Sequence, residues 1–106
     1  MKTIFYQKYL DSAGEEKIGL SIGVNKGKEI NIVVQYERFI GDKWCAIVRY
    51  DCSDGFFHRD LLFPRGEKEK QIISIPTLEE ALNFAELDLK DRREIYTNNY
   101  KKKLIK

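Results

Sequence analysis

The fold is decided by the stretch from Val48 to Asp60, which reads Val-Arg-Tyr-Asp-Cys-Ser-Asp-Gly-Phe-Phe-His-Arg-Asp. At its centre, Asp54-Gly55 is typical of a two-residue hairpin turn, because both positions of a type I′ turn need a positive φ angle. Counting outward from this turn gives three cross-strand pairs: Asp51 with His58, Tyr50 with Arg59, and Arg49 with Asp60. The stretch therefore predicts an antiparallel hairpin with a defined register.

Further runs of β-branched and aromatic residues lie on both sides of this hairpin and are separated by turn-forming residues. They predict strands at about residues 3–10, 17–24, 29–40, 44–52, 56–63 and 71–75. Thr77, followed three residues later by Glu80, forms a capping box, and apolar residues then recur at helical spacing, which predicts a helix over about 78–100. We expect a single α+β domain over residues 1–106, in which a five- to six-stranded antiparallel meander packs against one long C-terminal helix.

The predicted hairpin register brings four polar residues onto one face of the sheet, and we call them the polar cluster: Arg49, Asp51, His58 and Asp60. As a catalytic site, the cluster would use His58 as a general acid or base, Asp51 to orient it and Arg49 to hold an anion. As a structural feature, it would consist of cross-strand ion pairs on the solvated side of the sheet, which is the more common arrangement. Tyr50 would point to the opposite face.

A second turn at Gly41-Asp42 allows the same counting for the preceding pair of strands. It predicts three cross-strand pairs: Phe39 with Trp44, Tyr36 with Ile47, and Val34 with Arg49. The more apolar face is then expected to lie under the helix, and it carries Phe39, Trp44, Ala46, Val48, Tyr50, Phe57 and Leu61.

Composition excludes several classes of protein. The chain has 106 residues, 42% of them hydrophobic and 34% charged, which argues for a folded core beneath a densely charged surface. A net charge of +2 is far from the basic excess of nucleic-acid-binding proteins. Neither an apolar signal core nor a membrane-length apolar run is found, so we expect no membrane association and a cytoplasmic location.

The two cysteines, Cys45 and Cys52, belong to one predicted strand and would lie roughly 23 Å apart at about 3.3 Å per residue. A disulfide requires Cα atoms within about 7 Å, so both are expected to be free thiols. They are not accompanied by a CxxC motif or a histidine cluster. We therefore expect no metal and no cofactor.

The central block also resembles a group of small prokaryotic proteins of unknown function. In that group a Val-Arg-Tyr-Asp strand leads through a glycine turn into a His-x-Asp strand, here Val48–Asp51, Gly55 and His58–Asp60. The residue before the turn glycine is often histidine in the group and is Asp54 here. The resemblance covers roughly residues 32–63 and the helix. It implies no particular activity, although small proteins with such blocks are similar to members of toxin–antitoxin pairs.

These observations leave more than one class of function open. The first is a protein-interaction or regulatory module, which would bind a protein partner or a second copy through an open sheet edge. The alternative is a small hydrolase or nuclease that uses the polar cluster. Nucleic-acid binding through Lys101–Lys103 ranks last, because lysines in the last turn are explained by the helix dipole.

Overall fold

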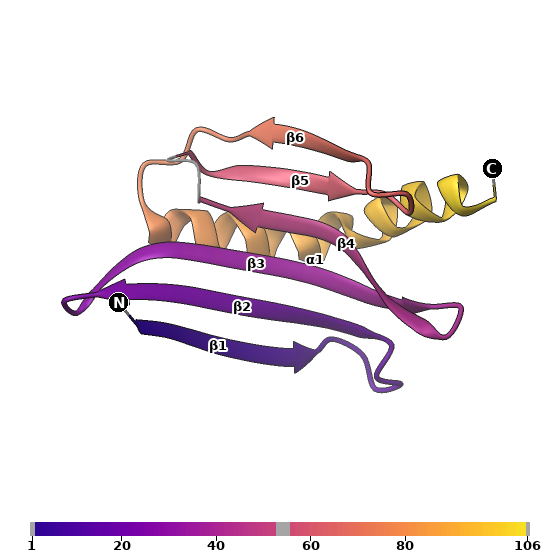
Figure 1. Ribbon diagram of the computed structural model, residues 1–106, viewed down its shortest axis with the longest axis horizontal. Coiled ribbons are helices and arrows are strands. Elements are labelled where there is room, and N and C mark those ends of the chain that lie inside the picture. The colour runs from indigo at the N-terminus through magenta and orange to yellow at the C-terminus, as the bar shows by residue number, and fades with distance from the viewer. Residues whose placement is uncertain (1, 53–55, 106) are drawn as a thin grey trace.

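The computed structural model describes residues 2–52 and 56–105, and its strands form one antiparallel sheet (Figure 1). The sheet has six strands in the order β1-β2-β3-β4-β5-β6, so every strand pairs with its neighbours in the sequence. The strand bounds are β1 Lys2–Tyr9, β2 Glu16–Asn25, β3 Lys28–Ile40, β4 Lys43–Asp51, β5 His58–Leu62 and β6 Lys68–Ile72. The α+β meander expected from the sequence is confirmed.

One long helix, α1 (Leu78–Leu104), follows the sheet. It begins where the capping box predicts, because the Glu80 amide donates a 3.1 Å hydrogen bond to Thr77 Oγ1. Acidic residues lie in its first turn and Lys101–Lys103 in its last, which complements the helix dipole. The helix ends at Leu104, four residues beyond the expected end, and includes these lysines. Among the described residues, no helix combines the length and apolar character that crossing a membrane requires.

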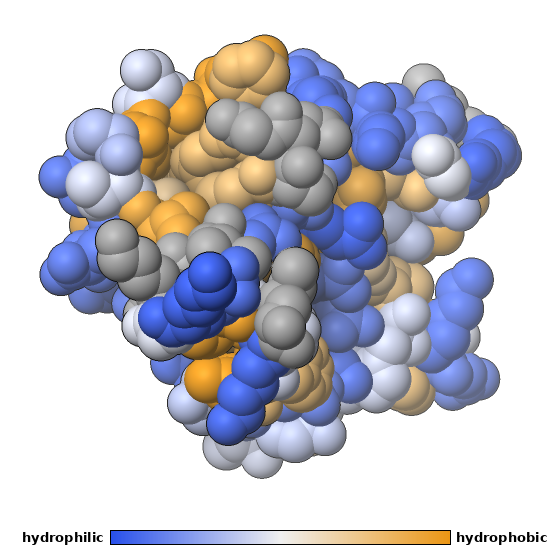
Figure 2. Space-filling view, turned by 60° about the vertical axis from the view of Figure 1, so that its left-hand side comes forward, coloured by the Kyte–Doolittle hydropathy of each residue, from blue (hydrophilic) through white to orange (hydrophobic). Residues whose placement is uncertain are grey.

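The helix lies across one face of the sheet and packs against β3 and β4 (Figure 1). The largest fully buried side chains lie mainly on these strands: Tyr36, Tyr50, Ile32, Ile47, Val34 and Val48. In the described parts of the chain, 2–52 and 56–105, no helix covers the opposite side of the sheet, which we call the open face (Figure 1). Hydrophilic side chains cover much of the surface in Figure 2, with apolar surface visible between them.

Two buried carboxylates fasten the helix to the sheet. Asp88 Oδ2 accepts hydrogen bonds from Tyr50 Oη at 2.6 Å, Tyr96 Oη at 2.7 Å and Arg59 Nη1 at 2.8 Å. Burial, reinforced by the bond to Asp88, raises the pKa of Tyr50 above its usual value and raises the pKa of Tyr96 to about 12. The phenols therefore stay protonated and continue to donate.

The second carboxylate is Glu16, which accepts from Tyr36 Oη at 2.5 Å and from Arg93 Nε at 3.0 Å. Burial, followed by the hydrogen bond to Glu16, raises the pKa of Tyr36 to about 12. Since Glu16 begins β2 and Arg93 lies on α1, this contact joins the edge of the helix to the second strand.

A β-bulge in β4 changes the register that was expected between β3 and β4. Phe39 pairs with Trp44 as predicted, but the register shifts after Tyr36, so that Tyr36 pairs with Val48 and Ile47 is the extra residue. Val34 consequently pairs with Tyr50. The expected pairs Tyr36–Ile47 and Val34–Arg49 are therefore wrong.

The same bulge corrects the predicted helix-side face. Val48, Tyr50, Phe57 and Leu61 lie on that side, whereas Phe39, Trp44 and Ala46 lie on the open face. Ala46 pairs with Glu37, a residue that lines a groove on the open face, and Trp44 contacts Tyr9 at a centroid distance of 6.1 Å. One inserted residue exchanges the two faces of a strand, because side chains alternate with a period of two.

β5 is shorter than expected, and β6 keeps its expected length of five residues but begins at Lys68 instead of residue 71. A tight turn explains its early start: the Phe63 amide donates to the Glu67 carbonyl at 2.9 Å, and the Gly66 amide donates to the Phe63 carbonyl at 3.1 Å. Pairing continues directly from this turn. Charged residues can form an edge strand, since most of its side chains remain in water.

Candidate functional site

The polar cluster is built by the β4–β5 hairpin, whose register agrees with the prediction. Asp51 pairs with His58, Tyr50 with Arg59, and Arg49 with Asp60. The turn at Asp54-Gly55 lies outside the described residues. Since residues two apart share a face of the sheet, all four members of the cluster belong to the open face.

His58 and Asp60 form a buried pair within this cluster. His58 Nε2 lies 3.5 Å from Asp60 Oδ2, and each residue is only 3% exposed. His58 Nδ1 lies 3.3 Å from the Phe56 carbonyl oxygen, to which it can donate when it carries the proton. Asp60 Oδ1 is buried and has no hydrogen-bond partner among the described residues. A substrate would reach this imidazole only after surrounding side chains had moved.

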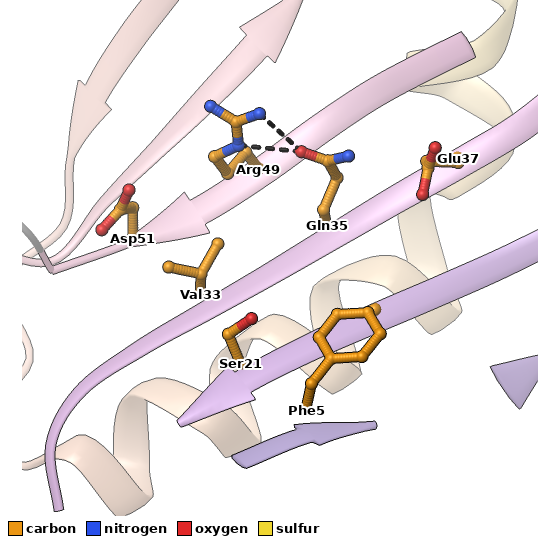
Figure 3. Close-up of a pocket in the computed structure, with 8 residues that line it drawn as sticks. Phe5, Ser21, Val33, Gln35, Glu37, Arg49 and Asp51 are labelled. Carbon is orange, nitrogen blue, oxygen red and sulfur yellow. Dashed lines mark hydrogen bonds between the residues drawn. The ribbon is translucent and has the colours of Figure 1, made fainter. Parts of the chain in front are cut away.

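Arg49 and Asp51 occupy a different environment, because both line a groove on the open face (Figure 3). The groove has a volume of about 370 Å³ and is lined by Phe5, Gly19, Ser21, Val33, Gln35, Glu37, Arg49 and Asp51. Arg49 donates from Nε at 2.8 Å and from Nη2 at 2.6 Å to Gln35 Oε1. Gln35 therefore holds the guanidinium above the sheet.

Small residues on β2 hollow out this groove. Gly19 pairs with Gln35, and Ser21 pairs with Val33, so a hydrogen atom and a hydroxymethyl group lie between larger neighbours. The Phe5 ring from β1 occupies the space above Gly19, where an added Cβ would lie 3.3 Å from two ring atoms. The groove thus has an aromatic wall on one side and the Gln35–Arg49 pair on the other.

The groove on this face offers charged, polar and apolar groups for binding. Within the described residues, no group of three or more His, Cys, Asp or Glu side chains could hold a metal ion. The groove combines the cation of Arg49 with the carboxylates of Glu37 and Asp51 and with the apolar surface of Phe5 and Val33. Polar groups beside apolar surface allow contact with a polypeptide or a small polar ligand.

The strongest exposed feature of the sheet is its first strand, which sequence reasoning treated as an ordinary strand. Phe5, Tyr6 and Tyr9 are 62%, 57% and 59% exposed. Phe5 and Tyr9 lie on the open face, and Tyr6 lies on the helix side, beside a groove that Glu86 of α1 also lines. A signal for this was present: Ile4-Phe5-Tyr6 is a consecutive apolar run and lacks the alternation of a strand with one buried face.

The backbone of β1 is also available for pairing. Its last bond to β2 is donated by the Leu10 amide to the Glu16 carbonyl at 2.8 Å. In an antiparallel ladder, alternate residues direct N–H and C=O to the same neighbour, so the even-numbered residues of β1 face β2. The remaining residues direct these groups away from β2: Thr3, Phe5, Gln7 and Tyr9. We call these groups, with the exposed side chains of the strand, the β1 edge.

The fold and this surface define a small α+β protein with an open sheet, one covering helix and an exposed, aromatic edge strand. Residues 1–105 match the family described as a domain of unknown function, DUF7718, and the chain belongs to that family. None of the curated proteins and none of the solved structures with which the chain was compared matches it.

Proposed function

We propose that the protein is an interaction module that binds a polypeptide partner by adding a strand to the β1 edge. The observation that carries this proposal is the combination of outward-directed N–H and C=O groups on β1 with large exposed aromatic side chains on the same strand. Main-chain hydrogen bonds would supply affinity, and the side chains on the two faces would supply selectivity.

The opposite edge of the sheet supports this assignment by contrast. β6 has five residues, and from Lys68 to Gln71 they are charged or carry an amide. A short, charged edge is a common protection against pairing with other chains. β1 has eight residues, with three large exposed aromatic side chains. The chain protects one edge and leaves the other suited to pairing.

An enzyme that uses the polar cluster is the second candidate, and the structure supports it less well. His58 is 3% exposed, whereas a general acid or base must come within hydrogen-bond reach of its substrate. Arg49 and Asp51 do line an accessible groove, which can contribute to recognition of a partner. The thiols of Cys45 and Cys52 are free, which fits action in a reducing compartment such as the cytoplasm.

Site-specific photocrosslinking in cells tests the proposal. A benzophenone amino acid replaces Phe5 on the β1 edge or, as a matched control, Ile72 on β6, which is 68% exposed. We expect protein adducts on irradiation from position 5 and none from position 72. Gln7→Pro should abolish them, because it removes an outward N–H and leaves the bonds between β1 and β2 intact. Equal adducts from both positions, or none from position 5, would contradict the proposal.

A further inference from the structure

We infer that the partner strand is β1 of a second copy of this chain, paired antiparallel about a two-fold axis that passes through Tyr6. This inference rests on the proposed function and gives its partner an identity. The two sheets would then join into one continuous sheet with both helices on the same side, because a two-fold axis perpendicular to a sheet preserves its faces.

The geometry of the edge restricts how two copies can pair. Residues that face each other across antiparallel strands lie on the same face of the sheet, so a two-fold axis must pass through a residue and not between two residues. Axes at Phe5 and at Tyr6 give the longest overlap of the strand with its copy. In both registers the outward N–H and C=O groups of the odd-numbered residues form hydrogen-bonded pairs. With the axis at Phe5, Thr3 pairs with Gln7 and Phe5 pairs with its own copy. With the axis at Tyr6, Thr3 pairs with Tyr9 and Phe5 pairs with Gln7.

Charge distinguishes these two registers. An axis at Phe5 places Lys2 opposite Lys8 of the second copy, and symmetry repeats this repulsive pair. An axis at Tyr6 instead places Lys8 opposite Ile4 and Lys2 opposite Leu10. Directly opposed like charges destabilise a sheet, whereas the alkyl part of a lysine can pack over an apolar neighbour. The register with the axis at Tyr6 is therefore favoured.

Packing on the helix side agrees with this register. Beside Tyr6 lies a groove of about 330 Å³ that is lined by Tyr6, Gln7, Lys8, Ile18, Leu20 and Glu86. The axis brings the two Tyr6 rings together as a non-hydrogen-bonded pair, the closer of the two kinds of antiparallel pair. Ile4 of the second copy would then lie beside Lys8, at the rim of this groove. Apolar side chains that are solvated in the single chain become covered.

The expected affinity follows from the size of the contact. A single pair of edge strands is a small contact compared with the roughly 800 Å² per partner of stable complexes, so we expect a weak dimer. Sedimentation velocity over a wide concentration series should show a reversible monomer–dimer equilibrium. Gln7→Pro should give a monomer throughout. Tyr6→Glu, which places two carboxylates on the axis at an exposed position, should weaken the dimer at least tenfold and serves as a second variant should the proline disturb folding.

Disulfide trapping tests the register. In a Cys52→Ser background, Tyr6→Cys should form a crosslinked dimer under mild oxidation, because Cα atoms of a non-hydrogen-bonded pair lie about 4.5 Å apart, within the range of a disulfide. Phe5→Cys is the matched control, since its copy would be offset by two residues and too far away. Crosslinking of Phe5→Cys but not Tyr6→Cys would overturn the inferred axis.

The experiments separate this inference from the function on which it rests. If the protein is strictly monomeric and the crosslinker at position 5 captures a different protein, the inference that the partner is a second copy is overturned, whereas the proposed interaction module still stands. A monomer that yields no adduct would overturn both. A concentration-dependent dimer that loses its self-adducts in Gln7→Pro supports both.

Discussion

Replacement of Asp88 by alanine should destabilise the fold more than any surface change, because this carboxylate is the point where α1 meets the sheet. Its Oδ2 atom accepts bonds from two phenols and one guanidinium, and the side chain is 5% exposed. Alanine would leave Arg59 with an uncompensated charge and leave Tyr50 and Tyr96 without their acceptor. Water cannot easily replace the carboxylate at such a buried position.

The magnitude can be worked from these contacts. Removing one partner of a buried ion pair costs about 3–5 kcal/mol. The total free energy of unfolding of a domain is typically about 5–15 kcal/mol, so the variant should lose a large share of it. For a chain of this length, each kcal/mol lowers the midpoint of thermal unfolding by about 4–8 °C. We therefore expect a fall of more than about 12 °C.

Urea and thermal unfolding followed by far-ultraviolet circular dichroism provide the measurement. Glu94→Gln is the matched control: Glu94 also pairs with an arginine across the helix–sheet contact, at 2.8 Å, but its side chain is 63% exposed. An exposed pair of this kind contributes about 1 kcal/mol or less. If Asp88→Ala cost no more than this control, the buried carboxylate would not be what holds the helix to the sheet, and the reasoning would be refuted.

Three further outcomes are expected from the structure. Thr77→Ala should destabilise the protein by about 1 kcal/mol in urea unfolding, since it removes the acceptor at the start of α1; an unchanged midpoint would count against the cap. The pKa of Tyr36 is raised from 10.0 to about 12, so its contribution to stability is complete below pH 10 and is lost as pH rises toward 12. Because raised pKa values of Tyr50 and Tyr96 act in the same direction, Tyr36 is assessed from a difference: across this window Tyr36→Phe should lose about 2–3 kcal/mol less of its free energy of unfolding than the unaltered protein. Identical pH profiles of the two proteins would contradict this prediction. Gly19→Ala should raise stability by about 0.5 kcal/mol, because the exposed Phe5 ring can yield to the added methyl, whereas Gly41→Ala, at a φ angle of 55°, should lower it by about 1 kcal/mol. A loss of stability in Gly19→Ala together with a gain in Gly41→Ala, measured by denaturant unfolding, would refute this pair of predictions.

The features that could be predicted from the sequence are those governed by local chemistry. The pairing of Asp51 with His58 follows from a turn three residues away, and the start of α1 follows from Thr77 and Glu80. Counting from Gly41-Asp42 also gave the correct Phe39–Trp44 pair, because both turn residues have positive φ angles.

The remaining features depend on contacts between distant parts of the chain. The bulge at Ile47 places two consecutive buried side chains, Ile47 and Val48, in a strand that would otherwise alternate, and no neighbouring residue in the sequence predicts the insertion. The separation of Arg49 from the buried His58–Asp60 pair also depends on a contact with a distant part of the chain. Gln35, from the neighbouring strand β3, draws Arg49 into the groove while Asp60 lies beside His58. Which side chain takes which partner is set by the third strand, which the hairpin sequence does not contain.

The charged character of β6 has a consequence for how large any assembly can become. Growth by strand pairing continues only if each added molecule brings a fresh surface to which the next can attach. A chain with two receptive edges would extend into open filaments, as exposed edges do in aggregation. With Lys68 to Gln71 on one side, addition through β1 uses up the only receptive edge that each copy presents among the described strands. If the proposed pairing through β1 holds, assembly stops at a closed pair, because the charged residues from Lys68 to Gln71 leave β6 unsuited to further pairing.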